Sequence, residues 1–205
     1  MELKDYIRII KKNLIVIVAV TVVFGLVAYL ATARQKPVYN STIGIEITRE
    51  QAAKQADTPY YQFDNYYATQ AATALSDNVI GWLAAPSFVS EIFNKAGYET
   101  PPGSLRELSK IFTARKKISN SSVIDISYSS TNSQKAEKII KTAAGMIKDK
   151  TDALNSSQDT AKYITSVSTP VVITSPKPLL LNTLIGVFVG LFLTIGYAFI
   201  KNSTK

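Results

Sequence analysis

The sequence predicts an α+β extracytoplasmic domain between two transmembrane α-helices. Uncharged apolar runs at residues 13–33 and 179–200 are each close to the ~20 residues that a helix needs to cross a bilayer. Between them, stretches with a two-residue hydrophobic period alternate with stretches of helical period. Residues 34–178 have the size of one ordinary domain, so a single soluble domain is expected between the two spans.

Basic residues predict how the chain is oriented. Four of them precede the first apolar run, namely Lys4, Arg8, Lys11 and Lys12, whereas its far end has only Arg34 and Lys36. Such residues favour the cytoplasmic side of a span. We therefore expect a multi-pass protein of the plasma membrane, with residues 1–12 and 201–205 in the cytoplasm and residues 34–178 outside. The alternative is that a signal peptide is cleaved after Ala33. The apolar run of residues 14–30 argues against it, because the apolar region of a signal peptide is typically ~7–15 residues long.

The first expected element outside the membrane is a strand at residues 38–48. Three isoleucines share one face of it, because they alternate with polar residues and a glycine: Ile43, Ile45 and Ile47. This period of two predicts a strand with one buried face.

Two helices are expected after this strand. Thr58 at the N-cap and Pro59 in the first turn mark the start of one helix. Pro86 interrupts its pattern, and we expect Ser87 to cap a second helix that ends near Gly97.

The sequence of the second half of the domain predicts a short helix, a β-hairpin, a long helix and an extended segment that leads into the second span. Ser104 and Glu107 have the spacing of a capping box. Residues 111–118 and 121–129 fit the strands of a hairpin that turns near Asn120. An amphipathic helix follows over residues 131–155, with its lysines facing solvent. Prolines keep residues 161–180 extended, and we expect this last strand to lie beside the first.

The composition argues against most catalytic chemistry. The chain has no histidine and no cysteine, which excludes Ser-His-Asp and Cys-His catalysis and thiolate metal sites. No glycine-rich phosphate loop is present. The net charge of the chain is +8. Residues 34–178 contain 17 basic and 13 acidic residues, so +4 of this charge belongs to the soluble domain. We therefore expect no enzyme, no cofactor, no metal and no nucleic-acid partner.

Aromatic side chains cluster ahead of residue 70, as Tyr60, Tyr61, Phe63, Tyr66 and Tyr67. Stacked aromatic rings can bind sugars or bases. The same residues can also pack against the domain's own sheet or a neighbouring subunit. Phe63 and Tyr67 continue the apolar stripe of the expected helix, which favours packing.

Glycines mark a possible packing face in the second apolar run. Gly186 and Gly190 form a G-x-x-x-G pattern, and Gly196 lies on roughly the same face. Small residues at this spacing let helix backbones approach closely. We predict that this face mediates helix association, within one chain or between chains.

Several segments resemble the polysaccharide co-polymerases, also called Wzz-type chain-length determinants. They are MELKDYIRIIKKN before the first span, VYNSTIGIEI, VIDISYSSTNSQKAEKIIKTAAGMI and the proline-rich residues 169–178. The last is the most specific, and its motif residues are Pro170, Ser175, Pro176, Lys177 and Pro178. The chain resembles a short form, because residues 152–162 leave no room for the long helical extension of many members, and it shows neither a kinase domain nor a tyrosine-bearing tail.

The resemblance implies a non-enzymatic membrane protein that acts as a homo-oligomer. Such a protein would regulate the chain length or export of a lipid-linked glycan, such as a lipopolysaccharide, capsule or exopolysaccharide. The implied partners are a polysaccharide polymerase or export proteins. Two alternatives stay open: an adaptor or scaffold for a separate tyrosine kinase or export machinery, and a glycan-binding ectodomain.

Overall fold

The computed structural model describes residues 3–50, 64–156 and 162–203. The chain divides into two compact units. The two ends, up to residue 37 and from residue 176, form one that we call the helical unit, and residues 38–175 form the other, the sheet unit. The expected class, a mixed α+β domain flanked by two long apolar helices, is confirmed.

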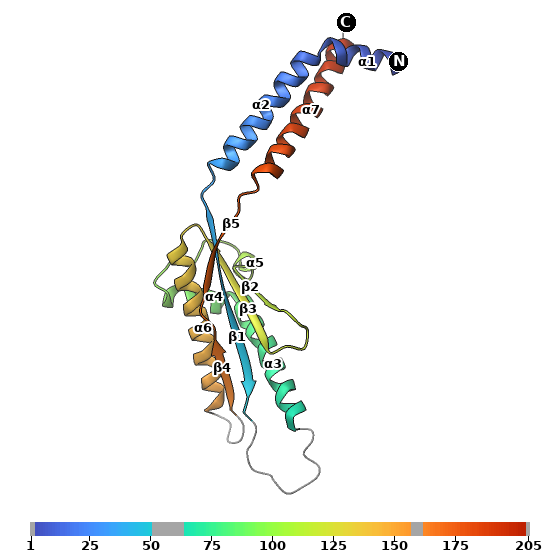
Figure 1. The fold of residues 1–205 in the computed structure, drawn as a ribbon. Helices are drawn as coiled ribbons and strands as arrows, with labels where there is room; N and C mark the ends of the chain where they lie inside the picture. Colours follow the sequence, from blue (N-terminus) through green and yellow to red (C-terminus); the bar gives the residue numbers. More distant parts are fainter. Residues whose placement is uncertain (1–2, 51–63, 157–161, 204–205) are drawn as a thin grey trace. The chain divides into compact units, whose positions relative to one another are not determined.

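The helical unit contains α1 (Leu3–Lys12), α2 (Leu14–Ala33) and α7 (Leu179–Ser203). Helices α2 and α7 run antiparallel, side by side (Figure 1). Both are long and apolar enough to cross a membrane. Within this unit they form a helical hairpin, with α1 joined to α2 through the single residue Asn13.

The sheet unit is built around one long central strand. The sheet has the order β2-β3-β1-β4, and β5 also pairs with β1. Every pairing is antiparallel. The strands are β1 (Val38–Arg49), β2 (Phe112–Lys116), β3 (Val123–Ser130), β4 (Tyr163–Val167) and β5 (Val171–Ser175).

The last strand lies beside the first, as expected, but it is divided into two. The start of β1 pairs with β5 and its end pairs with β4. Between them Pro170 has no N–H to give to the ladder. Ser168 bridges the interruption, because its hydroxyl accepts a hydrogen bond from Gly44 N at 2.8 Å and its own N–H donates to Gly44 O at 2.9 Å.

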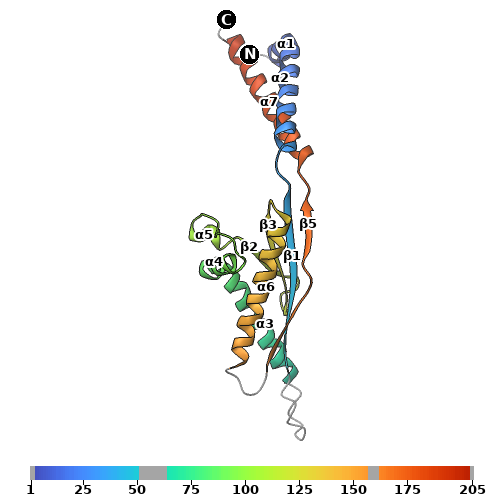
Figure 2. The same ribbon diagram turned by 90° about the vertical axis from the view of Figure 1, so that its left-hand side faces the viewer.

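Helices α3 (Asp64–Ala84), α4 (Pro86–Lys95) and α6 (Ser133–Asn155) cover one face of the sheet (Figure 2). Strand residues of period two meet helix residues of period 3.6 there. The core comprises, among others, Ile43, Ile45, Ile47, Val79, Leu83, Phe93, Ile124, Ile126, Ile139, Ile140 and Ile147. The expected inward faces of β1, β3 and α6 are therefore confirmed.

Three aromatic rings anchor one end of this core. Phe93, Phe112 and Tyr128 lie with ring centres 5.6–6.4 Å apart. Burial raises the pKa of the Tyr128 phenol, while a hydrogen bond with Ser130 opposes the shift. The hydroxyl therefore stays protonated at neutral pH and serves as a packing group.

The expectation that Ser87 caps the second helix is wrong. Helix α4 begins at Pro86, and its extended N-cap residue is Ala85 (φ −80°, ψ 118°), two positions before Ser87. The first turn leaves its N–H groups unpaired, so proline starts a helix without loss. The far end is as expected: Gly97 has φ +76°, a conformation that favours glycine. The expected helix start at Thr58 and Pro59 lies outside the described residues.

Helix α6 begins at Asn132, whose side-chain Oδ1 accepts a hydrogen bond from Lys135 N at 3.1 Å. We expect Asn132→Ala to lower the free energy of unfolding by about 1 kcal/mol, because an N–H of the first turn loses its partner. Asn132→Asp keeps an acceptor and is the matched control. Denaturation of the full chain in detergent micelles, followed by the fluorescence of the only tryptophan, Trp82, measures both. Equal losses in the two variants would contradict this role.

The predicted capping box is confirmed at α5 (Leu105–Leu108). Ser104 N donates to Glu107 Oε2 at 2.7 Å, and Glu107 N donates to Ser104 Oγ at 3.4 Å. The backbone hydrogen bond from Ser104, followed by its side-chain hydrogen bond, lowers the pKa of Glu107.

This geometry predicts a pH response of α5. The carboxylate form is favoured in the folded state, so the stabilisation is present above the unfolded pKa of Glu107 and is lost as the pH falls through its lowered folded pKa. Carbon-detected NMR titration of Glu107 should give a pKa below that of an unstructured glutamate. In Ser104→Ala the pKa should rise only part of the way, because the backbone N–H of residue 104 remains. A normal pKa in the unmodified chain would refute the prediction.

Candidate functional site: a close-packed helical hairpin

Two of the predicted glycines lie directly against α2. A Cβ atom on Gly186 would lie 2.5 Å from Ala28 Cβ and 2.9 Å from the Phe24 carbonyl oxygen. A Cβ atom on Gly190 would lie 2.8 Å from Phe24 Cβ. Non-bonded carbon atoms prefer separations of about 3.5–4.0 Å. Only hydrogen fits at these two positions, so the α7 backbone approaches α2 closely.

The same interface includes a glycine that the sequence analysis did not single out. A Cβ atom on Gly25 of α2 would lie 2.8 Å from Val187 Cγ2. Gly25 is the only glycine in residues 13–33, and this could have indicated a close helix contact. Gly196 differs, because nothing lies within 4 Å of the position of its Cβ. The structure therefore brings Gly25, Gly186 and Gly190 together, and leaves Gly196 away from α2.

Polar groups join the two helices at the end of the hairpin where α2 stops and α7 starts. Asn182 Nδ2 donates to Thr32 Oγ1 at 3.1 Å, and Thr32 Oγ1 donates to Ala28 O at 2.9 Å. Thr32 is only 3% exposed. In an apolar environment these polar atoms need partners, and each helix supplies one for the other.

The proline-rich motif divides between the two units. Pro176, Lys177 and Pro178 precede α7, and Lys177 Nζ donates to Ala33 O, the last residue of α2, at 2.7 Å. Pro170 lies just before β5, and Ser175 is the last residue of β5, opposite Val38. The prolines fix φ without requiring hydrogen-bond acceptors.

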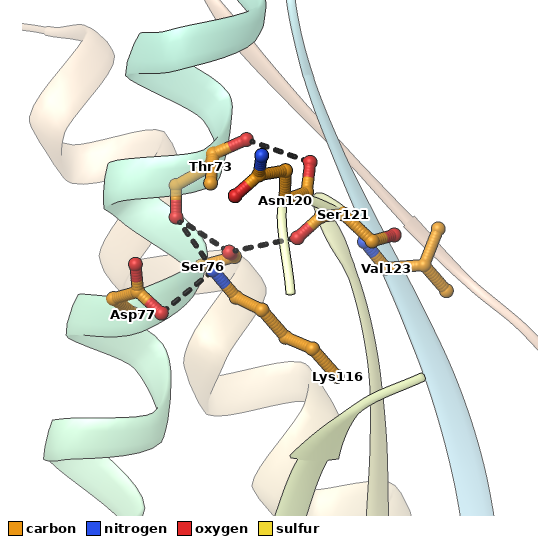
Figure 3. Close-up of polar contacts among 7 residues, drawn as sticks. All are labelled: Thr73, Ser76, Asp77, Lys116, Asn120, Ser121 and Val123. Carbon is orange, nitrogen blue, oxygen red and sulfur yellow. Dashed lines mark hydrogen bonds and ion pairs between the residues drawn. The ribbon is translucent and has the colours of Figure 1, made fainter. Parts of the chain in front are cut away.

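A second polar cluster, which we call the α3 clasp, lies in the sheet unit (Figure 3). The side chain of Lys116 is only 8% exposed. Its Nζ lies 2.6 Å from Asp77 Oδ1 and donates to Thr73 O at 3.1 Å. A charge this deeply buried requires such partners, and they fix the end of β2 to α3.

The α3 clasp continues into the turn between β2 and β3. Thr73 Oγ1 donates to Asn120 O at 3.4 Å, and Ser76 Oγ lies 3.5 Å from Ser121 O. The predicted turn at these residues is confirmed, but Lys116 was not singled out. The signal was its alternation with Phe112 and Ala114 in β2, which places all three on the helix-covered face.

The aromatic cluster does not extend the core as expected. Tyr67 is 64% exposed, and the buried face of α3 begins at Ala72, so the expectation that Tyr67 packs in the core is wrong. Tyr66 lies edge-to-face with Tyr67, with ring centres 5.8 Å apart. Tyr60, Tyr61 and Phe63 lie outside the described residues. Among the residues with described coordinates, no group of three or more acidic, histidine or cysteine side chains could hold a metal ion.

A comparison with protein-family models matches the first part of the chain. The model of the chain length determinant protein family, Wzz, matches residues 1–94, which run from α1 through α2, β1 and α3 into α4. Over these residues, which are somewhat less than half of the chain, the chain is similar to the Wzz family. The suspected resemblance is therefore confirmed for the part that holds the first apolar helix and the central strand. The search of curated proteins finds no match.

The match to the chain length determinant family points to the regulation of polysaccharide chain length and to a polysaccharide export system. That family is generally non-catalytic, and no catalytic domain is evident in the described part of this chain. The two helices that could span a membrane flank the sheet unit in sequence.

Proposed function

We propose that the protein is a non-enzymatic membrane regulator of the chain length of a lipid-linked surface polysaccharide, and that it acts as a homo-oligomer. The family match over α1 to α4 is the observation that carries this proposal. The two candidate spans agree with it, because a lipid-linked glycan is handled at a membrane. The partners under this proposal are the glycan and the proteins that polymerise or export it.

The proposal places residues 13–33 and 179–200 in the plasma membrane and residues 34–178 outside it. The termini, residues 1–12 and 201–205, are then cytoplasmic. The basic residues before α2 support this orientation. In that arrangement the glycine interface holds the two spans together, and the prolines at 176 and 178 stiffen the entry to the second span.

Deletion of the gene tests the main proposal. We expect the length distribution of the surface polysaccharide, separated on a gel, to change on deletion and to return when the intact chain is supplied from a plasmid. A chain with the second span removed should not restore it, although it must be shown to accumulate. An unchanged length distribution after deletion would overturn the proposal.

Crosslinking in native membranes tests the oligomer separately. An amine-reactive reagent should give a ladder of species larger than the monomer, because the described residues carry many exposed lysines. The same treatment after dilution in detergent is the control for random collision. A ladder that stops at the monomer in membranes would count against self-assembly while leaving the role in chain length to be judged by the deletion.

A further inference from the structure

We propose that α1 is an interfacial helix that lies on the membrane surface and binds the headgroups of anionic phospholipids. This interaction goes beyond the regulation of chain length. It rests on the proposed membrane span at α2, but on no property of the glycan. The argument uses the residue pattern of α1, its attachment to α2 and the exposure of its side chains.

The residue pattern of α1 separates apolar from basic positions. At 3.6 residues per turn, one side of the helix receives the apolar positions Leu3, Tyr6, Ile7, Ile9 and Ile10. The opposite side receives Lys4, Asp5, Arg8, Lys11 and Lys12. This side carries four basic residues against one acidic residue. A short helix with an apolar face and a basic face is typical of helices that lie in the membrane interface.

The attachment to α2 keeps α1 at the membrane boundary. Only Asn13 separates the two helices, and its backbone (φ −106°, ψ 10°) interrupts them. Asn13 Nδ2 donates to Ile9 O at 2.9 Å, and Ile17 N donates to Asn13 O at 2.9 Å, so the connection is hydrogen-bonded on both sides. Figure 1 shows α1 turning away from the axis of α2 where the two helices join. A helix connected so tightly to an apolar span cannot move far from the lipid surface.

The exposure of α1 leaves part of its apolar face for lipid. Ile9 is 5% exposed, so the helical unit already covers it, whereas Ile7 remains 47% exposed. Lys11 and Lys12 are exposed as well. At the boundary of a bilayer, Ile7 can enter the acyl region while the lysines meet the headgroups. Phosphate-bearing anionic lipids complement this charge, because basic residues next to a span are attracted to an anionic leaflet.

Spin labelling tests the placement, since the chain has no native cysteine and each introduced one is unique. The full chain carrying Ile7→Cys or Lys11→Cys is labelled with a nitroxide in nanodiscs of phosphatidylcholine with phosphatidylglycerol. The label at position 7 should collide more with dissolved oxygen than with a water-soluble nickel chelate, and the label at position 11 should do the reverse. Equal accessibility of the two labels, or protection of position 7 from both reagents, would overturn the proposal.

A label at Val22→Cys separates this outcome from a failure of the proposed topology. Val22 is 62% exposed on α2 and should be accessible to oxygen alone. If position 22 meets the nickel chelate, α2 does not span the bilayer, and the proposed topology fails together with the inference. If position 22 behaves as expected and positions 7 and 11 do not differ, the inference about α1 alone fails.

Charge variants test the lipid chemistry. With the label at position 7, replacing neutral nanodiscs by ones containing phosphatidylglycerol should lower access of the nickel chelate. Lys11→Gln with Lys12→Gln should abolish this dependence on phosphatidylglycerol. The matched control is Lys141→Gln with Lys148→Gln, two exposed lysines of the sheet unit, which should leave it intact. Absence of the dependence in the unmodified chain, or its loss in the control, would refute recognition of anionic lipid by α1.

Discussion

Gly186→Leu is expected to push the two apolar helices apart, whereas Gly196→Leu is expected to leave them together. At Gly186 the first added carbon already lies 2.5 Å from Ala28 Cβ and 2.9 Å from the Phe24 carbonyl oxygen. One of these atoms is backbone, so a change of side-chain rotamer cannot relieve the contact. We expect a loss of about 3 kcal/mol in the association of the helices, the upper part of the range for overpacking. At Gly196 nothing lies within 4 Å, and the effect should be small.

Distances between spin labels on the two helices measure this effect. Val23→Cys and Phe188→Cys place labels at exposed positions of α2 and α7, away from the glycine contacts. In the parent chain the distance distribution should be narrow, and Gly186→Leu should broaden it and shift it to longer values. Ala28→Gly should partly rescue Gly186→Ala, because it removes the nearest clashing atom but not the Phe24 carbonyl. A narrow, unchanged distribution in Gly186→Leu would contradict the close packing.

Asp77→Ala is expected to destabilise the sheet unit more than Lys116→Met does. The lysine side chain is 8% exposed and the aspartate side chain 65% exposed. Removing Asp77 leaves a buried ammonium group with Thr73 O as its remaining described partner. Breaking a fully buried ion pair costs ~3–5 kcal/mol. Because water can reach the position of Asp77, we expect a loss of about 2 kcal/mol.

Lys116→Met removes the buried charge itself. Thr73 O keeps the hydroxyl of Ser76 as a donor at 2.6 Å, and methionine fills a similar volume, so the loss should stay below about 1.5 kcal/mol. The double variant should resemble Lys116→Met alone, since Asp77 then has no ammonium group to compensate. Denaturation followed by Trp82 fluorescence measures all three variants. A larger loss in Lys116→Met than in Asp77→Ala would contradict this account of the α3 clasp.

The sequence was sufficient to predict features that depend on local pattern. Alternation identified β1 and β3, helical period identified α6, and the capping box at Ser104 appeared where its spacing placed it. Pairing of the first and last strands was predicted from their shared approach to the apolar runs. These features are determined over a few residues, or by the chain's connection to the two apolar runs. The sequence pattern is therefore sufficient to predict them.

Features that depend on distant partners were missed or misplaced. Lys116 looks like a surface lysine until α3 supplies Asp77 and the carbonyl of Thr73. Tyr67 fits a helical stripe, but the sheet covers α3 only from Ala72 onward. Gly196 shares a face with the other two glycines by spacing, yet nothing meets its Cβ position. In each case the register of one element against another decides the outcome, and that register is not a local property.

The double pairing of β1 has a consequence for how the chain is made. One edge of β1 pairs with β4 and β5, which the ribosome synthesises much later than β1. The bonded residues Gly44 and Ser168, for example, are 124 positions apart. Until β4 and β5 are synthesised, the nascent chain presents an open strand edge with free N–H and C=O groups. Such edges are templates for pairing with another chain. A chain that stops before residue 163 lacks both β4 and β5, so it would keep this edge of β1 open to pairing with another chain.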